Sequence, residues 1–143
     1  MTTLPALAHL PGRTPRPEPG FFAPLLAGLP GLDAAALATS AAFRAGFDAF
    51  EARYYWEAHE LWEPVWAALP PASAERHLLR GLIQLANAGL KRRMGRPLAA
   101  LRIVALADAA LTEGFGAQRE SLMGISRHAV GTMRAQALAE SAE

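Results

Sequence analysis

The sequence predicts an all-α protein, a compact bundle or array of about five helices preceded by a Pro-rich extended N-terminal arm. Ala and Leu dominate the composition and β-branched residues are few, which favours helix over strand. Beyond residue 40, apolar residues recur at spacings of three and four, the period of a helix with one buried side. Pro and Gly residues separate these segments and predict where the helices end.

The totals place the chain among single-domain helical proteins. Its 143 residues are enough for one sizeable core, and we expect an arm over residues 1–30 and a helical domain over residues 31–143. A net charge of +1 provides no long-range field for nucleic acid or an anionic membrane. The absence of Cys excludes disulfides and thiolate metal sites and favours a cytoplasmic location. No apolar run approaches the ~20 residues that span a bilayer, and no cofactor is expected.

Residues 1–20 of the arm are interrupted by five Pro, so no regular helix fits there. The prolines are Pro5, Pro11, Pro15, Pro17 and Pro19. A flexible tail is one interpretation. The other is an extended arm that docks on the helical body through Phe21, Phe22, Leu25 and Leu26, because adjacent Phe side chains seldom stay in water without a role.

Two segments after the arm have clear starting signals. Asp33 is expected to cap a short turn through Ala34–Thr39. Ser40 starts a clearer helix, whose buried side is predicted to hold Phe43, Phe47 and Phe50. The apolar phase then shifts near Arg53, which predicts a tight corner and an αα-hairpin with the next helix.

The central helix is predicted from about Tyr55 to Leu69, with a kink or a local irregularity at Pro64. The third is predicted from its N-cap Ser73 to about Met94. A fourth covers residues 97–113 and is expected to bury in part Leu98, Leu101, Val104, Leu106 and Leu111. A weaker fifth helix covers about residues 120–139, with an apolar side of Leu122, Ile125, Val130 and Met133.

The densest chemistry of the chain lies on the central helix. At about 100° per residue, one side of it holds Tyr55, His59, Trp62, Glu63 and Trp66. His59 and Glu63 are neighbours four residues apart. Glu60 lies on the flank and Glu57 further round, and the side is too aromatic to be an ordinary solvated face.

The third helix carries a polar stripe that matches this side. The stripe consists of His77, Arg80, Gln84, Asn87 and Lys91. If it faces the central helix, Arg80 and Gln84 can pair with His59 and the nearby carboxylates, and Gly81 would let the two backbones approach closely. The candidate binding set is Tyr55, Glu57, His59, Glu60, Trp62, Glu63, Trp66, Arg80, Gln84, Asn87 and Lys91.

Three interpretations of this set stay open: a buried structural network, which leads, a pocket for a small ligand or a partner, and a metal or catalytic site. The metal alternative uses His59, Glu60 and Glu63, whose atom types suit a divalent ion. His59-Glu60 matches half of the zinc-protease motif, but a Glu at position 63 leaves it incomplete. An acid–base pair of His59 and Glu63 has no Ser or Cys nucleophile beside it.

One basic cluster, Lys91-Arg92-Arg93-Met94-Gly95-Arg96, ends the third helix. Cations there complement the helix macrodipole, and a phosphate-containing ligand is the alternative interpretation.

The stretch Tyr54–Trp66, followed by Arg80-Gly81-Leu82-Ile83-Gln84-Leu85-Ala86-Asn87-Ala88, resembles domain-of-unknown-function family 309. That family pairs a Y-x-E-A-H-E-x-x-E-x-x-W helix with a G-L-I-Q-x-A-x-A helix, and the similarity covers about residues 40–114. The resemblance implies a small all-helical fold and no established activity. It marks as motif positions Glu57, His59, Glu60, Glu63, Trp66, Gly81 and Gln84. Lys91 stands where relatives often carry a His, which weakens any role that needs a second imidazole.

The leading functional hypothesis is a non-enzymatic helical domain that binds a small molecule or a protein partner at the Tyr55/His59/Trp62/Glu63–Arg80/Gln84 junction. A metal-assisted hydrolase that uses the His/Glu cluster is the alternative. The apolar fourth and fifth helices suggest a third interpretation, a homo-oligomeric assembly module.

Overall fold

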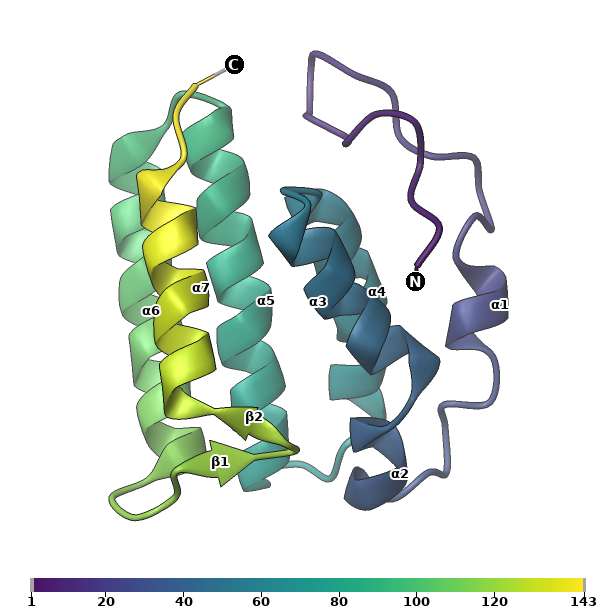
Figure 1. Ribbon diagram of the computed structural model, residues 1–143, viewed down its shortest axis with the longest axis vertical. Coiled ribbons are helices and arrows are strands. Elements are labelled where there is room, and N and C mark those ends of the chain that lie inside the picture. The colour runs from purple at the N-terminus through teal and green to yellow at the C-terminus, as the bar shows by residue number, and fades with distance from the viewer. Residues whose placement is uncertain (1, 143) are drawn as a thin grey trace.

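The computed structural model describes residues 2–142 and confirms the all-α prediction (Figure 1). In chain order the helices are α1 (Ala23–Leu26), α2 (Ala34–Ala38), α3 (Ala41–Glu51), α4 (Tyr55–Ala68), α5 (Ala74–Arg93), α6 (Pro97–Phe115) and α7 (Arg127–Ala139). A small antiparallel ribbon of β1 (Ser121–Leu122) and β2 (Ile125–Ser126) precedes α7.

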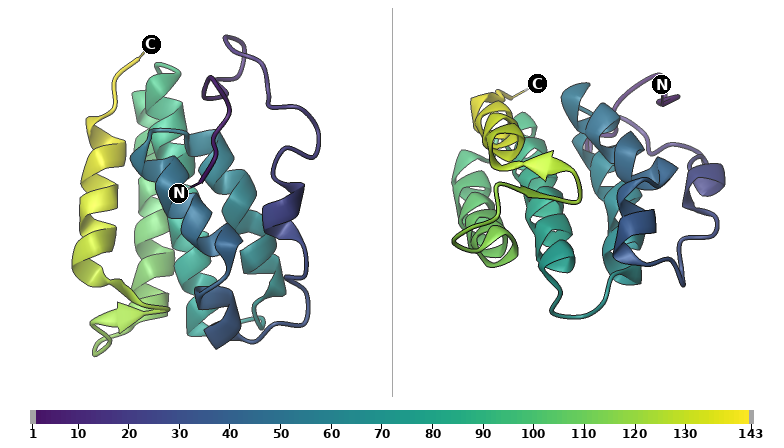
Figure 2. Two further views of the ribbon diagram at one scale, coloured as in Figure 1. Left: turned by 45° about the vertical axis from the view of Figure 1, so that its right-hand side comes forward. Right: turned by 60° about the horizontal axis from the view of Figure 1, so that its bottom comes forward.

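Helix α5 is the centre of the array. It packs against α4 on one side and against α6 and α7 on the other, while α3 packs against α4 (Figures 1 and 2). Its buried residues therefore extend around more than one side and include Leu78, Leu82, Leu85 and Leu90. The long helix joins the α3–α4 hairpin to the C-terminal helices.

Side-chain caps fix the starts of four of the described helices, α2, α3, α5 and α7. Asp33 accepts a hydrogen bond from the Ala36 N–H at the start of α2, and Ser40 accepts one from the Phe43 N–H at the start of α3. Ser73 does the same for α5. Each cap satisfies an N–H group that the first helical turn leaves without a partner.

The corner between α3 and α4 lies at Ala52–Tyr54, as the phase shift predicts. Arg53 adopts φ = 69° there, a left-handed conformation that reverses the chain after a helix. The Tyr54 N–H donates to the Ala49 carbonyl at 2.8 Å and closes the corner. Helix α4 then continues through Pro64 to Ala68.

The sequence-based prediction begins the last helix about seven residues before its observed start at Arg127. Residues 121–126 form the β1–β2 ribbon, and α7 begins at Arg127 with Ser126 as its cap. Met123 and Gly124 have φ of 52° and 77°, the pair of positive values that a tight hairpin turn requires. The prediction was wrong over residues 120–126 because the apolar spacing of Leu122 and Ile125 fits a helix and a short hairpin equally.

The prediction for α6 was also partly wrong. Val104 and Leu111 are buried, but Leu98, Leu101 and Leu106 are mostly exposed, Leu98 to 71%. Small residues form much of the side of α6 that meets α5, including Ala107, whose carbonyl lies beside Gly81. The leucines are spread around the helix, so one apolar stripe cannot include all of them.

The N-terminal arm packs along the helical body (Figure 2). Leu10, Phe22 and Leu29 belong to the hydrophobic core, while Phe21 remains 38% exposed. This arrangement agrees with the docked-arm interpretation and not with a free tail. Across the described residues, no helix combines the length and the apolar character that crossing a bilayer requires.

Candidate functional site

The residues on the predicted aromatic and ionisable side of α4 fall into two groups, one buried in the core and one near the surface. Tyr55 and Trp62 lie inside, each no more than 1% exposed. The Trp62 indole N–H donates to the Phe43 carbonyl at 3.0 Å, so its one polar group is satisfied in the core. His59 and Glu63 lie outside, with side chains 27% and 55% exposed. The prediction that this side is not solvated was therefore wrong for its outer half.

Glycines set the close approaches around this helix, but Gly81 is not the one that faces α4. A Cβ at Gly81 would lie 2.5 Å from the Leu111 side chain of α6. Gly89 instead receives the Tyr55 ring, with a Cβ position 2.7 Å from Tyr55 Cε1, and Gly46 receives the Trp62 indole. The helices approach closely because these two positions have no side chain.

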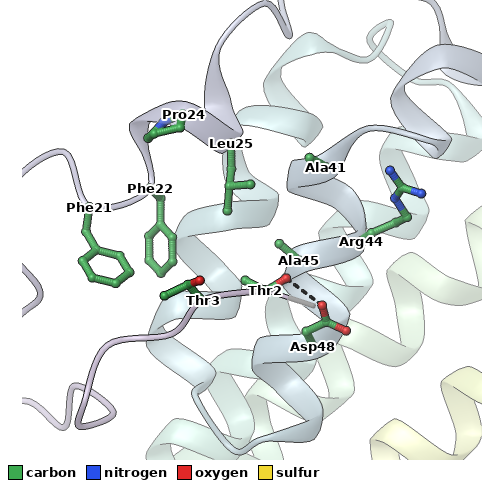
Figure 3. A pocket seen from close by; sticks show the side chains of 10 residues that line it. All are labelled: Thr2, Thr3, Phe21, Phe22, Pro24, Leu25, Ala41, Arg44, Ala45 and Asp48. Carbon is green, nitrogen blue, oxygen red and sulfur yellow. Dashed lines mark hydrogen bonds between the residues drawn. The ribbon is translucent and has the colours of Figure 1, made fainter.

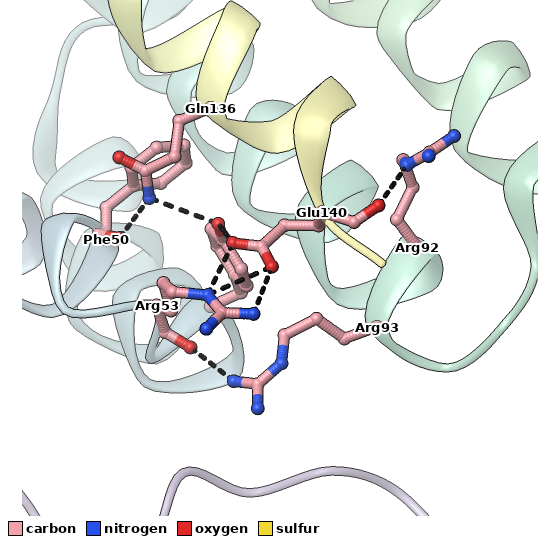
Figure 4. Close-up of polar contacts among 7 residues, drawn as sticks. Phe50, Arg53, Arg92, Arg93, Gln136 and Glu140 are labelled. Atoms are coloured by element: carbon pink, nitrogen blue, oxygen red, sulfur yellow. Dashed lines mark hydrogen bonds and ion pairs between the residues drawn. The ribbon is translucent and has the colours of Figure 1, made fainter. Parts of the chain in front are cut away.

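A polar network surrounds Glu140 at the end of α7, and Figure 4 labels Arg53, Gln136 and Glu140 among its members. Tyr55 belongs to the same network. Its hydroxyl donates to Glu140 and accepts a hydrogen bond from Gln136 Nε2 at 3.1 Å. The Arg53 guanidinium donates to Glu140 from Nε at 2.8 Å and from Nη2 at 2.5 Å. Glu140 is only 5% exposed, so this network connects α3, α4 and α7 through a buried carboxylate.

The network shifts the pKa values of both of its acids. Burial alone would raise the pKa of the Glu140 carboxyl, but the hydrogen bonds from Arg53 and Tyr55 outweigh burial, and the pKa is lowered. Burial and the hydrogen bond to Glu140 raise the pKa of Tyr55 far above its ordinary value. At neutral pH the carboxylate is therefore charged and the phenol is neutral.

Two residues of the predicted basic cluster also connect with this network. Arg92 Nε donates to the Glu140 backbone carbonyl at 2.7 Å, and Arg93 Nη1 donates to the Arg53 carbonyl at 2.9 Å (Figure 4). Both groups lie in the last turn of α5, where cations are favourable. These contacts agree with the structural interpretation of the cluster.

Glu57 is fully buried on another side of α4. Its Oε2 accepts a hydrogen bond from the His9 backbone N–H at 2.8 Å, and its Oε1 has no hydrogen-bond partner among the described residues. Burial raises the pKa of the Glu57 carboxyl, while the His9 N–H acts in the opposite direction. A buried carboxyl group with one unused oxygen is energetically unfavourable.

His59, Glu60 and Glu63 form the outer cluster of α4. Each offers one ligand atom, and these atoms all lie within 4.8 Å of one another. His59 Nε2 and Glu63 Oε2 are 2.6 Å apart. The donor set of one imidazole and two carboxylates fits a divalent ion in atom type.

Trp66 and Arg80, both in the predicted set, meet at the start of α5. They line a pocket of about 290 Å³ together with Ala72, Arg76 and His77. The Arg76 guanidinium carbon lies 4.1 Å from the centroid of the Trp66 ring, a cation–π contact. This pocket brings one side of α4 and the first turns of α5 into a single concave site.

The rest of the polar stripe on α5 does not reach the outer cluster. Asn87 Nδ2 donates to Gln84 Oε1 at 3.3 Å within the helix, and His59 pairs with Glu63 on its own helix. Among residues 2–142, no hydrogen bond joins Arg80 or Gln84 to His59, and the half-buried Lys91 side chain has no hydrogen bond or ion pair. The predicted set is therefore several separate groups.

Further cavities border the arm. One of them, of about 830 Å³, lies between the arm, α1 and α3 (Figure 3). Its walls include Phe21, Phe22 and Leu25, and Asp48 there accepts a hydrogen bond from the Thr2 hydroxyl at 2.6 Å. None of the predicted binding residues lines it. Another, of about 450 Å³, separates residues 16–23 of the arm from Trp56, Glu60 and Pro64.

Sequence-based reasoning did not include His9 and Glu140 in the set, although the structure pairs them with Glu57 and Tyr55. They are separated from these partners by 48 and 85 residues, and no local spacing connects them. The predicted set also lacks Arg76, although its position four residues before Arg80 was a usable signal.

Comparison with known proteins supports the family assignment and adds no activity. No curated protein and no solved structure matches the chain. Residues 43–103 match the family described as Domain of unknown function (DUF309), a segment that contains most of α3, all of α4 and α5 and the start of α6. The predicted resemblance is confirmed, and the arm and α7 lie outside the matched segment: over residues 43–103 this chain is similar to domain-of-unknown-function family 309.

Proposed function

We propose that this chain is a non-enzymatic binding domain for a small anionic molecule, a phosphate ester or a carboxylate, held at the junction of α4 and α5. One observation carries the proposal. Arg76, His77 and Arg80 line the same pocket as Trp66, and none of these three side chains forms an ion pair or hydrogen bond with a described carboxylate. The pocket therefore has unneutralised positive charge.

The place of these residues in the helix strengthens the argument. Arg76 and His77 belong to the first turns of α5, which begins at Ala74. The N-terminus of a helix is the positive end of its macrodipole, where cations are unfavourable and anions are stabilised. A bound anion would relieve this repulsion.

Arg76 provides a second, independent reason. Its Nε–H is buried and has no hydrogen-bond acceptor among the described residues, while its guanidinium face is held against Trp66. An unused buried donor is energetically unfavourable. An anionic oxygen in the pocket is the acceptor to which this Nε–H and the rest of the guanidinium would best donate.

The volume limits the size of the ligand. At about 290 Å³, the pocket is at the lower end of the range for small-molecule sites. It suits a compact phosphate ester or a short carboxylate, with the Trp66 ring as a wall for the apolar part.

The test is calorimetric titration of the full chain with inorganic phosphate and with phenyl phosphate at low salt. We expect Arg80→Gln to weaken binding at least tenfold and Arg76→Gln to do the same. Arg102→Gln removes an equally charged, exposed side chain from α6 and should leave affinity unchanged. Equal affinities in all four proteins, or no binding of either compound at millimolar concentration, would reject the anion site.

A divalent-metal site at His59, Glu60 and Glu63 is the second candidate, and the clustering of their ligand atoms within 4.8 Å favours it. Such an ion would act as a Lewis acid and support the hydrolase alternative. Elemental analysis of the untagged protein beside His59→Ala, with thermal unfolding of both, separates the cases. Stoichiometric metal in the parent alone, with a folded variant, supports this candidate, and a metal-free parent excludes it.

A further inference from the structure

The N-terminal arm contacts Tyr54 and the first turn of α4 through hydrogen bonds and ring contacts. The Tyr54 hydroxyl donates to the Pro5 carbonyl at 2.8 Å, and the His9 backbone N–H donates to Glu57. The His9 ring meets the Trp56 ring edge to face, with centroids 4.9 Å apart. The Arg16 guanidinium carbon lies 5.6 Å from the centroid of the same ring. We call residues 5–16 the strap and Tyr54, Trp56 and Glu57 the strap groove.

The strap has an internal structure that presents His9 to the groove. The Thr14 hydroxyl donates to the Ala8 carbonyl at 2.6 Å and accepts from the Leu10 N–H at 2.7 Å. His9 Nδ1–H donates to the Thr14 carbonyl at 2.9 Å. These bonds satisfy the groups on both sides of His9, and its own N–H is left for the Glu57 carboxylate.

The groove offers more hydrogen-bonding capacity than the strap uses. Glu57 is fully buried, yet only one of its oxygens has a described partner. The ionisable groups that act on its pKa electrostatically are His9 of the strap and Arg93 of α5. A second N–H donor in the groove would satisfy the remaining oxygen and recover part of the desolvation penalty.

We propose that Tyr54, Trp56 and Glu57 form a peptide-binding groove, and that the strap occupies it in cis as a displaceable ligand. The external partner is an extended peptide segment that donates main-chain N–H groups to Glu57 and places an imidazole or aromatic ring against Trp56. The contacts are of the kind that recognise peptides, namely main-chain hydrogen bonds with one side-chain anchor.

The placement of the two parts supports this inference. The three groove residues lie within the segment that matches the family, residues 43–103, whereas the strap lies outside it. A cavity of about 450 Å³ adjoins the groove where residues 16–23 stand away from Trp56, Glu60 and Pro64, which gives a competing peptide room to enter. The groove shares no residue with the proposed anion site, so either proposal can fail alone.

Native-state hydrogen exchange of the full chain tests whether the strap opens. We expect the His9 amide to exchange through a local opening, clearly faster than the amide of Leu85 in the core of α5, because residues 5–16 form no helix or strand of their own. Exchange of both amides only with global unfolding would contradict a displaceable strap.

Peptide binding tests the groove itself. A labelled peptide of residues 4–16 is titrated by fluorescence anisotropy into the parent and into full-length His9→Pro, which lacks the N–H that binds Glu57. We expect the peptide to bind the variant at least tenfold more tightly than the parent. A peptide N-methylated at the His9 nitrogen should lose at least tenfold in affinity, and an Arg13→Ala peptide, altered at an exposed position, should bind like the original.

Circular dichroism checks whether the His9→Pro variant is folded. If His9→Pro is unfolded, the titration uses Thr14→Val instead, which loosens the strap without changing the groove. Equal binding to parent and variant, no binding to a folded variant, or full affinity of the N-methylated peptide would each overturn the proposal.

Discussion

At the scale of single residues, two glycines determine how closely α4 packs. Gly46 of α3 lies under the Trp62 indole, and Gly89 of α5 lies under the Tyr55 ring. Both aromatic residues are fully buried, and protein interiors leave no room for an extra methyl group at such contacts. The sequence predicted the aromatic residues, but it pointed to Gly81 and not to these two, because a backbone approach depends on which helix each glycine faces.

We predict that Gly46→Ala destabilises the protein by about 3 kcal/mol or more, since its Cβ would overlap the Trp62 indole and force the core to rearrange. Gly131→Ala is the matched control. Gly131 lies in α7 with nothing near its Cβ position, so Ala there should stabilise the helix by up to about 1 kcal/mol. Urea unfolding measures both changes, and a Gly46→Ala protein as stable as the parent would contradict the packing.

At the scale of elements, local signals in the sequence predict the starts of helices well, but they predict short strands and the buried side of a helix poorly. Asp33 and Ser73 were predicted as caps and Ser40 as the start of a helix, and all three act as caps, because an N-cap acts within three residues of itself. The β1–β2 ribbon was not predicted, since two strands of two residues carry almost no periodicity. The exposed leucines of α6 were predicted to be partly buried because a count of apolar residues does not say which side meets α5.

We predict that Pro64→Ala stabilises α4 by about 1–3 kcal/mol. Pro64 lies inside the helix, so it withholds a hydrogen bond from the Glu60 carbonyl and its ring crowds the preceding turn. Pro97→Ala is the control, because Pro97 occupies the first position of α6, where proline fits the helix. Thermal unfolding should show a higher midpoint for Pro64→Ala only. A loss of stability would indicate that the ring contributes more through packing at the arm cavity.

At the scale of the whole molecule, Glu140 holds the two parts of the helical array together. Its carboxylate binds Arg53 and Tyr55 at the α3–α4 corner, and its backbone carbonyl binds Arg92 of α5. These partners are distant in sequence, so no local pattern could predict them. A single residue after α7 thereby couples the C-terminal helix to the family-like segment.

We predict that Glu140→Gln lowers the free energy of unfolding by about 2 kcal/mol at pH 7, a moderate effect because Arg53 is half exposed. The pKa of Glu140 is lowered in the folded protein, so its contribution is present above the ordinary carboxyl pKa of 4.5 and is lost as pH falls through the folded value. Urea unfolding between pH 7 and pH 3 should therefore show the parent and the variant converging at low pH. A constant difference would mean that the charge of Glu140 is not responsible.

The sequence by itself determined the helical class, the positions of the long helices, three helix starts, the α3–α4 corner and the family resemblance. All of these depend on interactions within a few residues or on a motif in one or two helices. Only the tertiary structure decided which polar residues meet. It paired Glu57 with His9 and Tyr55 with Glu140, placed Arg76 and Arg80 beside Trp66, and left His59 and Glu63 near the surface. Periodicity gives the side of a helix on which a residue lies, but the element that covers that side is chosen by packing across the whole chain.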